Sequence, residues 1–412
     1  MLYDAYEVQR SFLAGASRLA GMGAGWLNNP VNPFGYLSTS PLVAAALDVF
    51  AHAAAPRGKP DFGLAQTVID GQVLPVREEV LLRKPFGQLK HFVREGAPEG
   101  QPKLLIVAPM SGHFATLLRG TVERMLPGHD VFITDWRDAK LVSLADGSFD
   151  LDDYIDYLIE FIEAIGETGG QRPHVLAVCQ PAVPAFAATA LMNARRSRWR
   201  PRTLTMMGGP IDTREAPTAV NTLATERPLG WFQKNVVATV PLYYPGGGRK
   251  VYPGFLQLAG FMTMNLGDHL VSHWEMFKHL VEGDEESAES TRQFYDEYRS
   301  VADMTAEFYL QTVDVVFQRH LLPKGQLRHR GARVDPKAIR DTALLAIEGE
   351  RDDISGLGQT RAALDIATGL APAKKTYFMA RDVGHYGIFN GRKWREKIAP
   401  VVEDFIRAND TK

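Results

Sequence analysis

The chain has 412 residues, of which 45% are hydrophobic and 23% charged, a composition typical of a soluble globular enzyme with one large domain and insertions. Its formal net charge of −2 argues against a general nucleic-acid-binding protein, which needs a strongly basic face. A single cysteine excludes an internal disulfide and a cysteine-based zinc cluster, and no cofactor motif is present, so we expect neither metal nor cofactor.

The N-terminal region is predicted to be helical. Tyr3, Tyr6, Val8 and Phe12 are spaced to share one helical face, and the segment 28–33, which holds two prolines, interrupts the pattern. The first ten residues lack the basic and apolar regions of a signal peptide, and no apolar run reaches 18 residues. We therefore expect an N-terminal helical extension over residues 1–66, no membrane span and a cytoplasmic location.

The rest of the chain alternates short apolar runs with helical stretches. A strand-rich stretch covers 67–93, and later apolar runs predict strands at 104–108, 131–134, 174–178, 203–207, 343–347 and 375–379. Helices are predicted at 150–165, 181–195 and 357–368, with a last one that ends near 408. Strands and helices that alternate in this way are typical of an α/β fold with a mostly parallel central sheet and helices on both faces.

The alternation stops between residues 212 and 340, where we see no β-run. We predict a large helical cap or lid insertion there, inside a core formed by 67–211 and 341–412. The insertion is rich in aromatic residues, which either contact a substrate or form the core of the cap; they include Trp231, Phe255, Phe261, Trp274, Phe277 and Tyr295. His269 and His273 lie four residues apart but lack the glutamate of a His-Glu-x-x-His motif, so a metal site is the weaker interpretation.

Cys179 directly follows a predicted strand and directly precedes an alanine-rich helix. An α/β-hydrolase holds its nucleophile at this kind of tight strand-to-helix turn, usually as Ser in Gly-x-Ser-x-Gly. The helix N-terminus and a nearby histidine would stabilise a thiolate there. The local sequence Ala177-Val178-Cys179-Gln180-Pro181 departs from the glycine pattern, so an inert buried thiol is the alternative interpretation.

Two later residues favour the nucleophile. Asp352 follows the strand at 343–347, and the spacing Gly-x-x-Asp-x-Ile favours it over Asp353. His385 lies between two glycines after the next strand. Nucleophile, acid and histidine in this chain order, each near a strand end, are typical of an α/β-hydrolase triad. The sequence therefore predicts Cys179, Asp352 and His385 as catalytic residues.

An acyl-transfer site also needs two backbone N–H groups that face the developing oxyanion. One is expected from Gln180, which follows the nucleophile, and the other from the loop after the strand at 104–108. Pro109 has no N–H, so Met110 or Ser111 must supply it, and we favour Ser111. The Ser111 hydroxyl is a rival nucleophile, but no helix-opening turn follows it closely.

Three segments resemble intracellular polyhydroxyalkanoate (poly-3-hydroxybutyrate) depolymerases of the α/β-hydrolase superfamily: the start 1–7, the turn region 175–181, whose Cys-Gln-Pro is the most specific part, and the tail 382–394. The resemblance extends over nearly the whole chain. It implies a Cys-His-Asp triad that hydrolyses the ester bonds of storage granules through an acyl-cysteine intermediate, with Cys179 as nucleophile. It also implies the polyester granule surface as the partner, and a homo-oligomer is compatible with the sequence.

Two alternatives stay open at this point. A polyhydroxyalkanoate synthase is also a cysteine α/β-hydrolase and uses coenzyme A thioesters, but it typically carries Gly-x-Cys-x-Gly, which this chain lacks. A catalytically silent granule-associated scaffold with the same fold is the second alternative.

Overall fold

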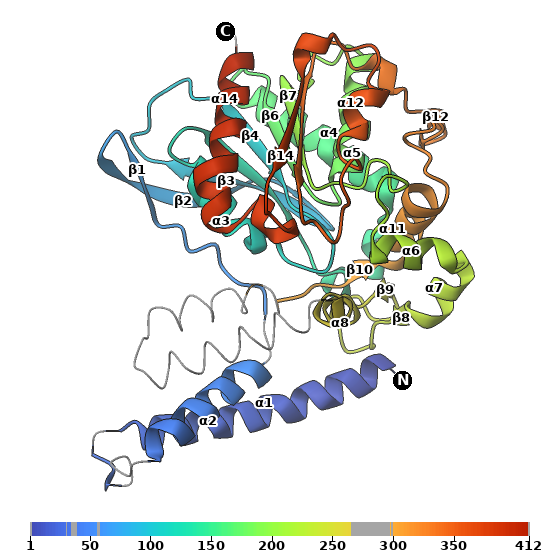
Figure 1. The fold of residues 1–412 in the computed structure, drawn as a ribbon. Helices are drawn as coiled ribbons and strands as arrows, with labels where there is room; N and C mark the ends of the chain where they lie inside the picture. The colour runs from blue at the N-terminus through green and yellow to red at the C-terminus, as the bar shows by residue number, and fades with distance from the viewer. Residues whose placement is uncertain are drawn as a thin grey trace.

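The computed structural model describes residues 2–29, 31–33, 39–55, 58–264, 297 and 300–410. In this part of the chain a nine-stranded sheet forms the centre of the molecule, in the order β1-β2-β3-β5-β4-β6-β7-β13-β14 (Figure 1). Pairing is antiparallel from β1 to β5 and parallel from β5 to β14. The strands are β1 (Gln66–Ile69), β2 (Gln72–Lys84), β3 (Gly87–Arg94), β4 (Lys103–Val107), β5 (Asp130–Trp136), β6 (His174–Val178), β7 (Thr203–Met207), β13 (Ala343–Gly349) and β14 (Lys375–Ala380).

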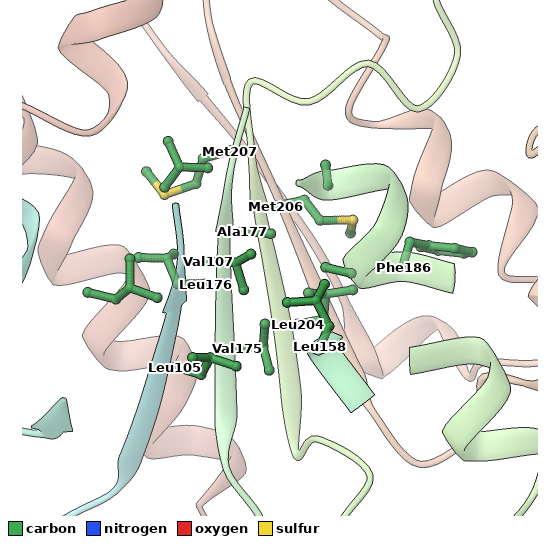
Figure 2. Packing of buried hydrophobic residues seen from close by; sticks show 14 of the residues in the cluster. Leu105, Val107, Leu158, Val175, Leu176, Ala177, Phe186, Leu204, Met206 and Met207 are labelled. Carbon is green, nitrogen blue, oxygen red and sulfur yellow. The ribbon is translucent and has the colours of Figure 1, made fainter. Parts of the chain in front are cut away.

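The strands at the centre of the sheet are buried on both faces. Every residue of β4, β6, β7 and β13 is buried, which explains why these strands appear as continuous apolar runs in the sequence. Figure 2 shows Leu105, Val175 and Leu204, which are in register on β4, β6 and β7 and so share one face of the sheet, with Leu158 and Phe186 of the covering helices in the same cluster. Two helices cover one face, α3 (Arg119–Met125) and α14 (Ala399–Asn409), and three cover the other, α4 (Leu151–Glu167), α5 (Ala182–Ala194) and α12 (Ala362–Ile366) (Figure 1).

The strand order identifies the fold. β5 lies between β3 and β4, and β6 leaves β4 on its other side, so the order of the sheet reverses at β4. Ligands of open α/β sheets bind beyond the carboxyl ends of the strands at such a reversal. A mostly parallel sheet with an antiparallel start, this order and helices on both faces is the α/β-hydrolase fold, as the sequence predicts.

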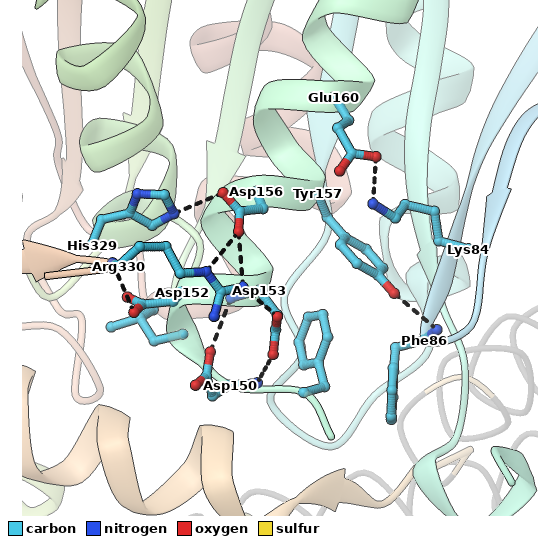
Figure 3. Close-up of polar contacts among 12 residues, drawn as sticks. Lys84, Phe86, Asp150, Asp152, Asp153, Asp156, Tyr157, Glu160, His329 and Arg330 are labelled. Atoms are coloured by element: carbon cyan, nitrogen blue, oxygen red, sulfur yellow. Dashed lines mark hydrogen bonds and ion pairs between the residues drawn. The ribbon is translucent and has the colours of Figure 1, made fainter. Parts of the chain in front are cut away.

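The first turns of α4 are held by an unusual number of polar contacts. Asp150 and Asp153 form a reciprocal capping box in which each carboxylate accepts from the other's backbone N–H at 2.9 Å. Arg330 reaches the carboxylates of Asp153 and Asp156, and His329 Nε2 lies 2.7 Å from Asp156 Oδ1 (Figure 3). The insertion is thereby attached to the hydrolase core by charged contacts at a helix N-terminus.

The insertion between β7 and β13 is helical only in part. Its described helices are α6 (Ala219–Glu226), α7 (Leu229–Asn235), α8 (Gly254–Met264) and α11 (Ala306–Thr312), which a π-helical segment (Val313–Gln318) extends. It also contains a three-stranded sheet of β8 (Ala238–Thr239), β9 (Lys250–Tyr252) and β10 (Met304–Thr305), and a hairpin of β11 (Arg328–His329) and β12 (Ala332–Arg333). The expectation of no strand between 212 and 340 was therefore wrong. These strands have only two or three residues, too few to show an alternating pattern.

The N-terminal extension is a pair of helices, α1 (Leu2–Leu27) and α2 (Ser40–Ala54), that stands apart from the main sheet on the side of α8, β8 and β9 (Figure 1). The helices approach closely because small residues lie between them: Gly21 faces Ala51, and the Ser17 hydroxyl donates to the Ala51 carbonyl at 2.7 Å. No described helix, α1 included, is both long and apolar enough to cross a membrane.

Candidate active site

Cys179 lies at the turn between β6 and α5 with a φ of +66°, a conformation that few side chains other than glycine adopt. Its backbone N–H donates to the Met207 carbonyl at 2.7 Å, and its carbonyl accepts from Ala182 N at 3.0 Å. The turn also needs space from the next strand, because a Cβ on Gly209 would lie 2.1 Å from Ala182 Cβ. The structure therefore holds Cys179 on a strained turn at the carboxyl edge of the sheet, where the sequence predicts a nucleophile.

The structure brings Asp352 and His385 together next to this turn. Asp352 lies in the loop after β13, and His385 begins the helical turn η8 (His385–Ile388) after β14. The Nδ1 atom of His385 is 2.8 Å from Asp352 Oδ2, and both side chains are buried. The other carboxylate oxygen, Oδ1, accepts from the backbone N–H groups of Ile354 and Ser355 at 2.9 and 2.8 Å. Both oxygens of Asp352 are thus used to fix its orientation.

Charge at the site acts mainly on His385. Burial alone lowers the pKa of the imidazole, but the negative charges of Asp352 and of an ionised Cys179, with hydrogen bonds to both, raise the pKa well above its usual value. His385 is therefore linked to Cys179 as well as to Asp352. The arrangement favours an imidazole that carries a proton between the Asp352 carboxylate and the sulfur of Cys179.

Contacts after β4 hold the loop that carries the second expected oxyanion donor. The carbonyl of Ala108 accepts from Trp136 Nε1 at 2.8 Å and from the Tyr154 hydroxyl at 3.1 Å, and Ala108 N donates to Thr134 Oγ1 at 2.9 Å. Two residues later, Met110 N donates to the side-chain oxygen Oε1 of Gln180 at 3.0 Å. The Met110 N–H therefore points toward the residue that follows Cys179, and an amide oxygen already lies against it.

A cavity of about 640 Å³ opens at Cys179 and His385. Ser111 and Gln180 lie at its base, and most of the wall is apolar and comes from the insertion, with Val220, Leu223, Phe232, Tyr252, Tyr309 and Phe317 among the lining residues. Among the described lining residues there is no lysine or arginine. Such a cavity suits an uncharged, extended ligand that presents a carbonyl group to the sulfur.

Some expected contacts are absent from the site. Asp353 is exposed, whereas Asp352 makes the contact to His385. Trp231 and Phe255 do not line the cavity: Trp231 packs edge-on against Phe232, and Phe255 stacks on Tyr6. Trp274, Phe277 and Tyr295, the side chain of Phe261, and the histidine pair at 269 and 273 lie outside the described residues.

Sequence reasoning did not identify Gly208, which directly follows β7 and lies next to Asp352 and His385. Its φ is +57°, and a Cβ there would lie 3.1 Å from Asp352 Oδ2 and 3.2 Å from His385 Cε1. It also missed Glu348, a buried carboxylate of β13 that accepts from the backbone of Thr360, whose hydroxyl in turn accepts from Gly209 N at 2.7 Å. For Gly208 the sequence offers only a pair of glycines after a strand, a feature that is common in ordinary turns. Nothing in the local sequence marks Glu348.

Comparison with known proteins gives one family. A family model described as PHB de-polymerase C-terminus matches residues 208–410, the segment that contains the insertion, Asp352 and His385. A search of curated proteins found no match.

Several solved structures share part of the architecture. One is described as a lipase (lip1) from Acinetobacter baumannii, with 13% identity, 81% of this chain and 93% of that chain covered, and a TM-score of 0.42. Another is DcsB in complex with its substrate analogue, with 15% identity, coverage of 82% and 99%, and a TM-score of 0.46. A third is a thermophilic esterase from Thermogutta terrifontis, with 13% identity, coverage of 82% and 99%, and a TM-score of 0.42. The TM-scores are all below 0.5, and the α/β-hydrolase fold is assigned from the strand order of the sheet.

The family match adds a class of chemistry to that fold. PHB is poly-3-hydroxybutyrate, a polyester, and a depolymerase of a polyester cleaves ester bonds, so the match identifies a carboxylic ester hydrolase. Residues 208–410 of this chain thus match the PHB depolymerase C-terminus family, and the chain has the α/β-hydrolase fold.

Proposed function

We propose that this protein hydrolyses the ester bonds of poly-3-hydroxybutyrate with Cys179 as nucleophile, His385 as general base and acid, and Asp352 as the residue that orients His385. The observation that carries the proposal is the buried hydrogen bond of 2.8 Å between His385 Nδ1 and Asp352 Oδ2, beside a cysteine held at φ +66° at the base of the cavity. A carboxylate on Nδ1 leaves Nε2 to exchange a proton with the sulfur.

The reaction takes two acyl-transfer steps. The proton of Cys179 passes to His385 and the sulfur attacks the ester carbonyl; the carbon–oxygen bond of the ester then breaks, and the departing hydroxyl takes the proton from His385. Water, which loses a proton to the same imidazole, attacks the thioester and releases the acid, and the proton returns to the sulfur. Asp352 supports each step because its charge stabilises the imidazolium.

The oxyanion of both steps would be held by the backbone N–H groups of Gln180 and Met110. Met110 is a better candidate than Ser111, since its N–H already donates to an amide oxygen, Gln180 Oε1, at 3.0 Å. The carbonyl of the substrate would displace that oxygen when it binds. This makes the Gln180 side chain a stand-in for the oxyanion in the free protein.

The cavity supports a polyester more than a coenzyme A thioester. Its described lining is largely apolar and has no lysine or arginine to pair with the phosphates of coenzyme A. An acyltransferase that uses coenzyme A is the second candidate, and assays of both products separate the two. Release of 3-hydroxybutyrate or its oligomers from amorphous polymer supports the hydrolase, whereas release of coenzyme A from hydroxybutyryl-CoA without ester hydrolysis would replace it.

The nucleophile is tested with Cys179→Ala. We expect this variant to lose at least about a thousandfold of the rate on a soluble hydroxybutyrate oligomer, because the acyl-enzyme cannot form. Ser111→Ala is the matched control, as it removes the hydroxyl that the sequence offers as the rival nucleophile and keeps the backbone N–H; we expect at least a third of the rate to remain. If Cys179→Ala is as active as the wild type, the triad is wrong, and a wild type without activity on any ester would favour a silent scaffold.

The place of action follows from the substrate. We propose that the protein works in the cytoplasm at the surface of polyester storage granules, since the family match names a polymer that would have to be reached at a surface. Fractionation of cells that store the polymer, with detection of the protein on purified granules, tests this location.

A further inference from the structure

The N-terminal helix α1 carries an exposed apolar stripe on the face opposite its described contacts with α2 and the insertion. Its members are spaced by four, seven, three and four residues, which places them on one line along the helix, and all are exposed: Val8, Phe12, Leu19, Met22 and Trp26. Phe12 is 76% exposed and Met22 71%. Single exposed apolar residues are common, but a continuous line of five that includes two aromatic rings indicates an interaction surface.

The opposite face of α1 is already used. Tyr3 donates to Asp303 at 2.5 Å, and Tyr6 stacks on Phe255 with ring centroids 3.8 Å apart, so this end of the helix packs on the insertion. Ser17 contacts Ala51 of α2 through a hydrogen bond of 2.7 Å. Tyr3, Tyr6 and Ser17 lie on the helical face opposite the stripe, because 100° of rotation per residue separates them from it by about half a turn. Val8, Phe12, Leu19 and Met22 therefore lie on the face of α1 that is turned away from these described contacts with α2 and the insertion.

We propose that this stripe binds the uncharged surface of an amorphous polyester particle and holds the cavity against it. The inference rests on the proposed function and adds to it the element that recognises the insoluble substrate. The balanced charge of α1 favours an uncharged polyester surface over an anionic lipid surface as the partner. Asp4 and Glu7 balance Arg10 and Arg18 in α1, whereas helices that bind anionic lipids are rich in lysine and arginine.

The size of the stripe disfavours a second copy of this chain as the partner. From Val8 to Trp26 the helix rises about 27 Å, and a strip about 10 Å wide gives about 270 Å². A stable protein interface needs about 800 Å² from each partner. A straight, narrow stripe suits contact with an extended surface, where the helix needs no shaped partner.

The position of the stripe connects it to the cavity. One side of α8 supplies Phe255, which packs on Tyr3 and Tyr6 of α1, while Gln257, Ala259 and Gly260 of the same helix line the cavity. A single helix therefore lies between the proposed surface-binding element and the candidate active site. Docking through α1 would bring the wall of the cavity to the particle.

The test compares two triple variants. Phe12→Gln, Leu19→Gln and Met22→Gln together replace the middle of the stripe; Val68→Thr, Val73→Thr and Val80→Thr together replace exposed apolar residues of β1 and β2 at the edge of the main sheet. Both sets are placed in the Cys179→Ala chain so that the particles stay intact, and binding to amorphous poly-3-hydroxybutyrate particles is measured by co-sedimentation. We expect the stripe variant to bind at least about tenfold more weakly and the control to stay within about twofold of the parent.

Three further measurements decide the outcome. With Cys179 restored, the stripe variant should hydrolyse a soluble hydroxybutyrate oligomer within about twofold of the wild type, and circular dichroism should show the same helix content. Unchanged particle binding by the stripe variant would overturn the inference. So would a wild-type dimer that the stripe variant loses in sedimentation velocity, or wild-type binding to phosphatidylcholine vesicles that equals its binding to the polymer. A wild type that fails to hydrolyse the soluble oligomer would instead contradict the proposed function.

Discussion

Cys179 and Gly208 illustrate how single residues shape the candidate site. Cys179 takes a φ of +66° at the end of β6, and Gly208 takes a φ of +57° at the end of the adjacent strand β7. The first presents a sulfur above the sheet edge, and the second leaves the space in which Asp352 and His385 meet. The two positive φ angles have different causes, one a strained turn and one a close approach.

Gly208→Ala should impair catalysis more than it impairs folding. The new methyl group would lie 3.1 Å from Asp352 Oδ2 and 3.2 Å from His385 Cε1, so the pair must shift by a few tenths of an ångström. We expect kcat on a soluble ester to fall about ten- to a hundredfold. Gly63→Ala is the control, since Gly63 has a similar φ of +64° with no atom within 4 Å of its Cβ position. Equal activity of the two variants would show that the space at Gly208 is not needed.

The sequence predicted the candidate site residues that follow strands, but not the neighbouring residues that hold them in position. Asp352 and His385 could be selected because triad members follow strands in a fixed chain order, and the structure places them in contact. Gly208 could not, because its role depends on side chains that approach it from two other loops. The choice between Ser111 and Met110 stays a prediction; the hydrogen bond from Met110 N to the Gln180 side chain, which favours Met110, cannot be read from the local sequence.

At the scale of elements, the long and buried pieces were predictable and the short ones were not. β6 and β13 are buried at every position, so their apolar runs stand out from the surrounding sequence. β8 and β10 have two residues each and exist because β9 lies between them, which no local pattern reveals. The predicted helix at 357–368 shortens to Ala362–Ile366, since the residues before it form turns around Glu348.

Glu348 shows how one buried carboxylate can organise such a turn. Its two oxygens accept from the backbone N–H groups of Gly358, Thr360 and Arg361 and from the Tyr377 hydroxyl, at 2.8 to 2.9 Å. All four partners donate hydrogen bonds, so a glutamine at this position could not accept all of them, because one of its two terminal atoms is an NH₂ group that only donates. Because the Thr360 hydroxyl also accepts from Gly209 N, the turn is linked to the residue that packs beneath the Cys179 turn.

We predict that Glu348→Gln lowers the free energy of unfolding by about 1 to 3 kcal/mol, because its NH₂ group would face a backbone donor without a partner. Urea unfolding followed by tryptophan fluorescence measures the change. Glu350→Gln is the control: Glu350 is exposed and accepts from Asp382 N, so we expect a change within about 0.5 kcal/mol. A Glu348→Gln variant as stable as the control would mean that the turn does not depend on the charge.

At the scale of the whole molecule, three parts of the chain meet at a small acidic cluster. Asp303 of the insertion accepts from the Tyr3 hydroxyl of α1 and from Gly254 N, and its own N–H donates to Asp138, which follows β5. Lys140 Nζ lies 3.0 Å from the Asp138 carboxylate. Burial, followed by the nearby charge of Asp138, raises the pKa of Asp303 to about 6.

This cluster predicts a pH dependence. The folded chain binds the Asp303 proton more tightly than the unfolded chain, so the stability it contributes is complete below about pH 4 and is lost as the pH rises through about 6. A shift from 3.8 to about 6 corresponds to about 3 kcal/mol as an order of magnitude. Asp303→Asn removes this titration, so the variant should gain stability relative to the wild type between pH 4.5 and 7.5.

The effect of Asp303 is measured from the thermal unfolding midpoints of the wild type and of Asp303→Asn, each at pH 4.5 and at pH 7.5. His129 and His174 titrate in the opposite sense, because burial lowers the pKa of each, to about 4 for His129. They are present in both proteins, and the difference between variant and wild type cancels them. A constant difference across this range would show that Asp303 does not take up a proton on folding.

The central claim is that Cys179 carries the acyl group between two transfer steps, and trapping that intermediate tests it most directly. Protein acid-quenched during turnover of a soluble hydroxybutyrate oligomer, then digested and analysed by mass spectrometry, should show the peptide with Cys179 heavier by whole hydroxybutyryl units. Hydroxylamine should remove the added mass, as expected for a thioester. An acyl group found on Ser111, or active turnover with no adduct on Cys179, would contradict the account.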